Sequence, residues 1–216
     1  MPVATTSPAP SPNPVRGRLN SAFFAVMGGY INQRLGGHKR RIFDHRDGVV
    51  VEIGAGNGPN LRYLRSGTTV HAIEPNPHFH GRLRRAAAAH GIDLSIHPVP
   101  GEEIDLADGC ADAVVCTWVL CTVQDPARVL QEIHRILRPG GRFVFIEHVA
   151  APSGAVRRVQ TLVRRPWRWM FEGCHTDRDT AAAIRAAGFS AVEITQFRFR
   201  STFVPVRTQV AGTAVR

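Results

Sequence analysis

The middle of the chain alternates between two patterns of hydrophobic and polar positions. Short runs rich in Val and Ile are followed by segments in which apolar residues recur every three to four positions. This is the pattern of strands that alternate with helices in a mostly parallel sheet. Strands are predicted at Val49–Ile53, Thr69–Ile73, Asp93–His97, Ala113–Thr117 and Arg142–Glu147. Helices are predicted at Pro59–Arg65, Pro77–His90 and Pro126–Leu137.

The last third of the chain follows a less regular pattern. A basic, aromatic segment spans Val156–Phe171, a helix is predicted at Asp177–Ala187, and closing strands at Ala191–Phe197 and Val206–Ala214. We therefore expect an α/β fold with a mostly parallel, seven-stranded sheet and helices on both faces. The 216 residues suit one domain at 48–216, with an N-terminal helical cap at 16–47 and a disordered tail at 1–15, which is rich in Pro, Ser and Thr.

The net charge of +10 is concentrated at the two ends of the chain. Residues 1–47 carry seven Lys and Arg against two acids, residues 48–150 carry nine against eleven, and residues 151–216 carry eleven against four. Basic flanks fit a nucleic acid or an anionic membrane surface by electrostatics alone. Net charge is a non-specific signal, however, and 26 of the 27 basic residues are Arg, which coding bias also explains. We therefore do not expect a nucleic-acid partner.

Hydropathy and cysteine spacing exclude several classes of protein. No apolar run reaches the 18 residues of a membrane span, and the first residues lack the features of a secretory signal. We therefore expect a cytoplasmic protein without a membrane span. The four cysteines form no C-x-x-C pair, so neither a bound metal nor a disulfide framework is expected.

The strongest local signal is the segment Val50–Gly58, in which a buried strand runs into glycines at alternate positions and then into a helix. Glycines at such a turn let the backbone approach a ligand next to the helix N-terminus. Glu74 ends the next strand, where an acid can accept hydrogen bonds from both hydroxyls of a ribose. These features fit a nicotinamide cofactor as well as S-adenosylmethionine.

Two details favour S-adenosylmethionine. The glycines read G-x-G-x-G rather than G-x-G-x-x-G. Glu52 lies just before them, where a carboxylate suits a cationic amino-acid group and would repel a pyrophosphate.

Further motifs make the sequence resemble class I S-adenosylmethionine-dependent methyltransferases that act on small molecules, and more closely the animal alkyl-thiol S-methyltransferases. The motifs are Glu74–Pro77, Val115–Cys121, Leu137–Gly141, Glu147–Ala150 and Phe171–Cys174. The resemblance implies a Rossmann-like fold and a methyl donor held by Glu52, Gly54, Ala55, Gly56, Gly58, Glu74, Pro75, Gly101, Glu102 and Thr117. Within that set, Glu74 would lie at the ribose, Gly101 and Glu102 at the adenine, and the Thr117 backbone at the amino group.

The resemblance also implies a small lipophilic thiol as methyl acceptor. A thiol needs little help to ionise at neutral pH, and His148, directly after a predicted strand, is the candidate base. Aromatic and Met side chains before and after the sheet could form a dry acceptor site or could be ordinary core: Phe23, Phe24, Met27, Tyr30, Trp167, Trp169, Met170 and Phe171.

Other functions stay open at this level. An O- or C-methyltransferase acting on a phenol or quinone is the main alternative. A nucleic-acid methyltransferase, a non-catalytic cofactor-binding module and a nicotinamide-dependent oxidoreductase are less favoured.

Overall fold

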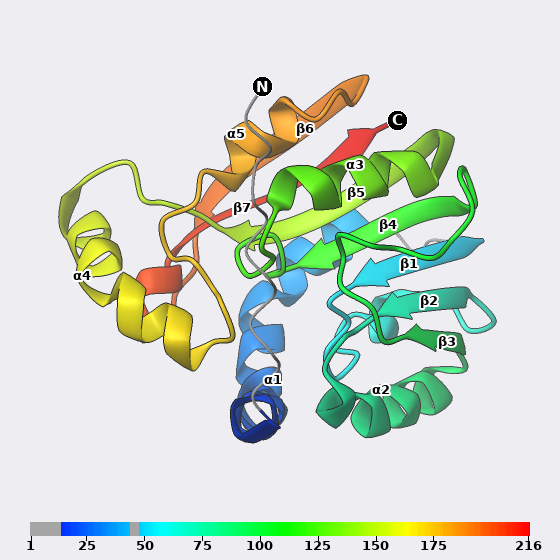
Figure 1. The fold of residues 1–216 in the computed structure, drawn as a ribbon, viewed down its shortest axis with the longest axis horizontal. Helices are drawn as coiled ribbons and strands as arrows, with labels where there is room; N and C mark the ends of the chain where they lie inside the picture. The colour runs from blue at the N-terminus through cyan, green and yellow to red at the C-terminus, as the bar shows by residue number, and fades with distance from the viewer. Residues whose placement is uncertain (1–13, 44–47) are drawn as a thin grey trace, which may run out of the picture.

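A computed structural model describes residues 14–43 and 48–216 and shows one sheet between two layers of helices (Figure 1). The strands are β1 (Val49–Ile53), β2 (Thr69–Ile73), β3 (Asp93–His97), β4 (Ala111–Thr117), β5 (Leu137–His148), β6 (Ala191–Arg198) and β7 (Thr208–Val215). The helices are α1 (Pro14–Phe43), α2 (Pro77–His90), α3 (Pro126–Ile136), α4 (Gly154–Met170) and α5 (Thr180–Arg185), with single 3₁₀ turns η1 (Leu61–Tyr63) and η2 (Val204–Val206).

The sheet has the strand order β3-β2-β1-β4-β5-β7-β6. The pairs from β3 to β5 are parallel, whereas β7 is antiparallel to both β5 and β6. The Rossmann-like α/β fold is therefore confirmed, with a mixed sheet. The physical reason for the antiparallel strand is the connection from β6 to β7, because residues 199–207 are too few for a crossover to a parallel strand.

Strand register brings the carboxyl ends of four strands to one edge. Ile53, which ends β1, pairs with Ile73 of β2 and with Cys116 of β4, and Thr117 pairs with Ile146 of β5. The residues that follow these strands therefore lie side by side. In open α/β sheets this edge is where ligands bind.

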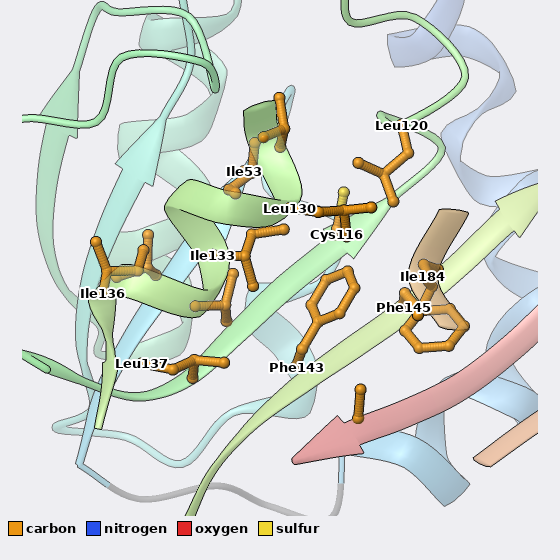
Figure 2. Packing of buried hydrophobic residues seen from close by; sticks show 14 of the residues in the cluster. Ile53, Cys116, Leu120, Leu130, Ile133, Ile136, Leu137, Phe143, Phe145 and Ile184 are labelled. Carbon is orange, nitrogen blue, oxygen red and sulfur yellow. The ribbon is translucent and has the colours of Figure 1, made fainter. Parts of the chain in front are cut away.

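Helices α3 and α5 cover one face of the sheet, as Figure 1 shows. The apolar positions of α3 lie on a single side and pack over β4 and β5, where Figure 2 shows Leu130 and Ile133 above Phe143. The N-terminus of α3 is capped by Asp125, whose Oδ1 accepts hydrogen bonds from the N–H groups of Ala127 and Arg128 at 3.0 and 3.1 Å.

Helices α1 and α2 cover the opposite face (Figure 1). The apolar side of α2 packs on β1 and β2 through Leu83 and Ala87. Among the described residues, no helix is both long and apolar enough to cross a bilayer.

Several predicted boundaries need correction. The helix predicted at Pro59–Arg65 is only the single turn η1, because Ser66 and Gly67 turn the chain back into β2. The basic segment Val156–Phe171 lies largely in helix α4, and the helix predicted at Asp177–Ala187 is confined to α5, with Asp179 as its N-cap.

Other differences are smaller. β5 begins at Leu137, where the predicted helix was to end, and β4 begins two residues early, at Ala111. Most of the predicted tail at 1–15 lies outside the described residues, and α1 already begins at Pro14.

The packing of α3 leads to a stability test. Ile133 is 0% exposed, so Ile133→Ala should lower the free energy of unfolding by about 2–5 kcal/mol, through lost burial and the cavity left behind. Urea unfolding followed by circular dichroism measures this change. Gln131→Ala, on the exposed side of the same helix, should stay within about 0.5 kcal/mol of the wild type. Equal losses in the two variants would contradict the packing described here.

Candidate functional site

The glycine turn follows β1 directly, and its three glycines differ in what surrounds them. All three have left-handed backbones, with φ of 64° at Gly54, 55° at Gly56 and 75° at Gly58. A Cβ at Gly54 would collide with Val119, and one at Gly58 would lie 3.0 Å from the Leu83 side chain. A Cβ at Gly56 would meet no atom closer than 3.9 Å. Gly54 and Gly58 thus permit close packing, whereas Gly56 leaves more room, because a Cβ there would only touch the Phe79 ring.

Glu74 follows β2 and is held against this turn. Its Oε2 accepts a hydrogen bond from the Gly56 N–H, and its Oε1 accepts one from the Asn76 N–H, both at 2.9 Å. Burial raises the pKa of Glu74 to about 7, although these two hydrogen bonds act in the opposite direction. Pro75, another predicted cofactor residue, lies exposed next to it. A carboxylate fixed at this strand end is placed to receive ribose hydroxyls.

Glu52 is buried near the end of β1 in a small polar network. Its Oε1 accepts a hydrogen bond from Asn60 Nδ2 at 2.7 Å, and the same amide nitrogen donates to Thr117 Oγ1 at 3.2 Å. Burial raises the pKa of Glu52 to about 7, against the hydrogen bond from Asn60 and the positive charge of Lys39. Lys39, on α1, is itself 1% exposed, and burial lowers its pKa to about 8.

Gly101 and Glu102 lie beyond β3, at the place predicted for adenine. Gly101 is buried against Ile53, since a Cβ there would lie 3.0 Å from Ile53 Cγ2. Glu102 Oε1 accepts hydrogen bonds from the N–H groups of Gln124 and Asp125 at 2.8 and 3.2 Å. Glu102 therefore anchors the start of α3, a role that the sequence did not indicate, and its contact with adenine stays a prediction.

These residues together fit S-adenosylmethionine. Ala55 closes the turn, because its carbonyl accepts the Gly58 N–H at 2.9 Å. In the predicted arrangement Gly56 would lie against the donor, Glu74 would accept hydrogen bonds from ribose hydroxyls, and Glu52 would attract the cationic amino-acid group. Glu52 and Glu74 are two buried carboxylates at the carboxyl ends of neighbouring strands, and together they would repel a pyrophosphate. The site therefore does not suit a dinucleotide.

Glu147 lies between the predicted donor residues described above and a second group of residues around His148. Its side chain is 0% exposed, and its Oε1 accepts hydrogen bonds from the N–H groups of Val119 and Leu120 at 2.8 and 3.1 Å. The loop after β4 is therefore folded onto the end of β5. Trp118 begins this loop with a φ of 59°, and its Nε1 donates to Gln209 Oε1 of β7 at 2.8 Å. Such a backbone conformation is strained for a bulky residue and persists because the surroundings hold it.

His148, the predicted base, ends β5 and is 2% exposed. Its Nε2 lies 3.1 Å from Cys174 Sγ, which lies 3.8 Å from Cys121 Sγ. The hydrogen bond from Cys121 and the positive charge of His148 hold the pKa of Cys174 well below its usual range. Burial alone would lower the pKa of His148, but the Cys174 thiolate outweighs burial and raises it. His148 is therefore one member of a buried group of three.

Several of the predicted wall residues meet next to this group. The rings of Phe23 from α1 and Phe171 after α4 contact edge to face, with centroids 5.4 Å apart, and Phe171 lies 4.4 Å from Trp167. Trp169 and Met170 do not belong to this wall, because they are 69% and 50% exposed. The helical period of α4 explains Trp169, which lies on the other side of the helix from Trp167. Met170 is the last residue of α4 and is half exposed there.

Sequence reasoning missed four residues of the site: Lys39, Asn60, Cys121 and Cys174. Asn60 carries a local signal, since it follows the glycine turn by two residues. The other three come from segments far apart in the chain, and only the fold brings them to the strand edge.

Comparison with known proteins agrees with this geometry. A family model described as a methyltransferase domain matches residues 51–145. The chain is 35% identical over 204 residues to the thiol S-methyltransferase TMT1B of Homo sapiens. The aligned region covers 89% of this chain and 84% of that protein. An S-adenosylmethionine-dependent methyltransferase from Mesorhizobium loti has a TM-score of 0.62 at 21% identity, covering 85% of this chain and 98% of its own. Geranyl diphosphate C-methyltransferase from Streptomyces coelicolor, solved with S-adenosyl-L-homocysteine, has a TM-score of 0.64 at 17% identity. The superposition covers 84% of this chain and 76% of that enzyme.

Glu74 allows a direct test of the donor site. Replacing it with Ala or Gln should raise the dissociation constant for S-adenosylmethionine tenfold or more, since hydrogen bonds to a charged group contribute roughly 1.5–3 kcal/mol. Isothermal titration calorimetry measures the constant, and circular dichroism checks that each variant is folded. Glu103→Ala removes an exposed carboxylate from the segment after β3 and should bind normally. Unchanged affinity in both Glu74 variants would place the ribose elsewhere.

The raised pKa of Glu52 predicts a pH dependence of binding. Near pH 6 most of a carboxyl group with a pKa of about 7 is protonated, and near pH 8 most is ionised. The ionised form attracts the cationic donor, so affinity should rise by up to about tenfold from pH 6 to pH 8. Calorimetry at both pH values measures the ratio. Glu52→Gln should show a smaller ratio of the affinities at pH 8 and pH 6. The ligand's own titration affects both proteins equally, so equal ratios in the wild type and the variant would contradict the role of Glu52.

Proposed function

We propose that this chain, which belongs to the thiol S-methyltransferase family of S-adenosylmethionine-dependent methyltransferases, methylates the sulfur of a small lipophilic thiol. That the chain is a methyltransferase with S-adenosylmethionine as donor rests on the family. The observation that supports a lipophilic thiol is the aromatic wall of Phe23, Trp167 and Phe171 beside the buried group of Cys121, His148 and Cys174.

A thiol suits a site with these properties. Bound S-adenosylmethionine supplies a methyl group on a positively charged sulfur, and an acceptor thiolate displaces that sulfur in line. Positive and negative charge disappear together as the new bond forms, so a dry apolar site disfavours the charged ground state. The protein contributes mainly by holding the two reactants in this geometry and excluding water.

His148 stays in our proposal as a residue that activates the thiol. Its Nε2 faces Cys174 Sγ at 3.1 Å, and its Nδ1 has no hydrogen-bond partner among the described residues. We therefore assign activation to the group of three residues rather than to His148 acting alone. The group lies at the end of β5, on the same strand edge as the glycine turn.

An acceptor series tests the proposed substrate class. For linear alkyl thiols from ethanethiol to octanethiol, kcat/KM should rise with each methylene by up to about fourfold, which corresponds to about 0.8 kcal/mol, until the pocket is full. Free cysteine should be a poor acceptor. Product formation from labelled S-adenosylmethionine measures these rates. Turnover of phenols with none of alkyl thiols would exclude the thiol and restore the phenol or quinone alternative.

A pair of variants on α1 tests whether the aromatic wall is responsible. Phe23→Ala removes a wall residue and should flatten the dependence on chain length, while the affinity for S-adenosylmethionine stays unchanged. Val26→Ala, on the exposed side of the same helix at 82% exposure, should retain the wild-type slope. If kcat/KM of Phe23→Ala rises with thiol chain length as steeply as that of the wild type, the chain-length preference arises elsewhere.

A further inference from the structure

Cys121, His148 and Cys174 come from three separate segments and converge on one buried point. Cys121 lies in the loop after β4, His148 ends β5, and Cys174 follows α4. They are 1%, 2% and 7% exposed. One sulfur or nitrogen atom from each lies within 4.8 Å of the other two.

The spacing of the two sulfurs matches an edge of a tetrahedral metal site, and the imidazole nitrogen lies somewhat closer to Cys174 than such an edge requires. Zinc bonds of about 2.3 Å to sulfur and 2.0 Å to nitrogen place two sulfurs about 3.8 Å apart, and a sulfur and a nitrogen about 3.5 Å apart. The Cys121 and Cys174 sulfurs are 3.8 Å apart, and His148 Nε2 is 3.1 Å from the Cys174 sulfur. We propose that Cys121, His148 and Cys174 bind one Zn²⁺ ion through two thiolates and one imidazole nitrogen.

The ligand set and its charge favour zinc. Thiolate and imidazole ligands suit zinc and not magnesium or calcium, which prefer oxygen. Two thiolates also neutralise the charge of a divalent ion, so the occupied site would bury no net charge. Trp167 Nε1 donates to Cys174 Sγ at 3.3 Å, a hydrogen bond of the kind that orients a metal ligand from outside the site.

The three ligand segments are held together independently of any metal. The His175 N–H donates to the Cys121 carbonyl at 2.7 Å, which joins the loop after β4 to the segment after α4. Arg178 Nη1 donates to the carbonyls of Leu120 and Val123 at 2.7 and 2.6 Å. The Ala150 N–H donates in turn to the Arg178 carbonyl at 2.9 Å. The ligands are therefore preorganised, which reduces the cost of ordering them on binding.

Three protein ligands leave the fourth position of a tetrahedral zinc for an exchangeable ligand, as in catalytic zinc sites. This step rests on the proposed function: the acceptor thiol binds at the fourth position and releases its proton to solvent. Its sulfur then forms a bond to the donor methyl group as the bond from that methyl to the donor sulfur breaks. The product thioether carries no charge and is a weak ligand, so it leaves the zinc.

Metal content tests the site without relying on activity. The full chain is purified without a polyhistidine tag under reducing conditions, and zinc is measured by mass spectrometry after dialysis. Wild type and Cys110→Ser, a cysteine outside the group, should each hold about one zinc per chain. Cys121→Ser, Cys174→Ser and His148→Ala should each hold at least fivefold less, and retained binding of S-adenosylmethionine shows that a variant is folded.

Cobalt substitution supplies a second readout. Reconstitution with Co²⁺ should give the near-ultraviolet absorption of thiolate bound to cobalt in the wild type and in Cys110→Ser. That absorption should be lost in Cys121→Ser. Adding octanethiol without a methyl donor should change the visible cobalt spectrum, because the thiol replaces the fourth ligand.

The outcomes separate this inference from the proposed function. Thiol methylation by a wild-type protein that binds neither zinc nor cobalt would overturn the metal site and leave the proposed function standing. A Cys121–Cys174 disulfide in the purified protein, seen as two fewer titratable thiols and no metal uptake after reduction, would also overturn it. A cobalt spectrum that octanethiol does not change would overturn the role of the fourth position.

Discussion

The buried carboxylate of Glu147 is the interaction on which the rest of the site depends. A carboxyl group that is 0% exposed is costly unless it is hydrogen-bonded, and here the N–H groups of Val119 and Leu120 bind its Oε1 at 2.8 and 3.1 Å, while Oε2 has no partner among the described residues. The bonds fold the loop after β4 back over the strand edge. Val119 then occupies the space that a side chain at Gly54 would fill, and Cys121 is carried toward Cys174. One buried group thus places the donor turn and the cysteine–histidine group relative to each other.

The fold, and the placement of the predicted donor residues at the carboxyl ends of the strands, could be predicted because their signals are local. The strands β1, β2 and β3 fall at their predicted residues, and Gly54 and Glu74 directly follow strands whose apolar pattern is unambiguous. Position at the carboxyl end of a parallel strand is enough to bring such residues together. A helix was predicted where only the turn η1 forms, because the pattern of apolar residues does not show that the chain turns back at Ser66 and Gly67.

The acceptor half could not be predicted in the same way. Its cysteines show no metal-binding spacing, and Cys121 and Cys174 are 53 positions apart. Their convergence depends on the hydrogen bonds of Glu147 and Arg178 to the loop after β4. These bonds join residues far apart in the chain, and no sequence period or motif predicts them. His148 was singled out because it directly follows a predicted strand, but its partners are set by tertiary structure. The same limit applies to Lys39, which lies in a helix and reaches Glu52 only when α1 packs on the sheet.

Helix α1 contributes to both the predicted donor site and the aromatic wall. Near its start, Asn20 Nδ2 donates to the Met170 carbonyl at 3.2 Å, and Ser21 Oγ donates to the His78 carbonyl at 2.9 Å. Near its end, Lys39 lies buried and attracts Glu52 in the donor site. The same helix therefore contributes Phe23 to the aromatic wall and a charge to the donor cradle. Because α1 is one continuous helix, its packing on the sheet fixes the positions of the Phe23 ring and the Lys39 charge together.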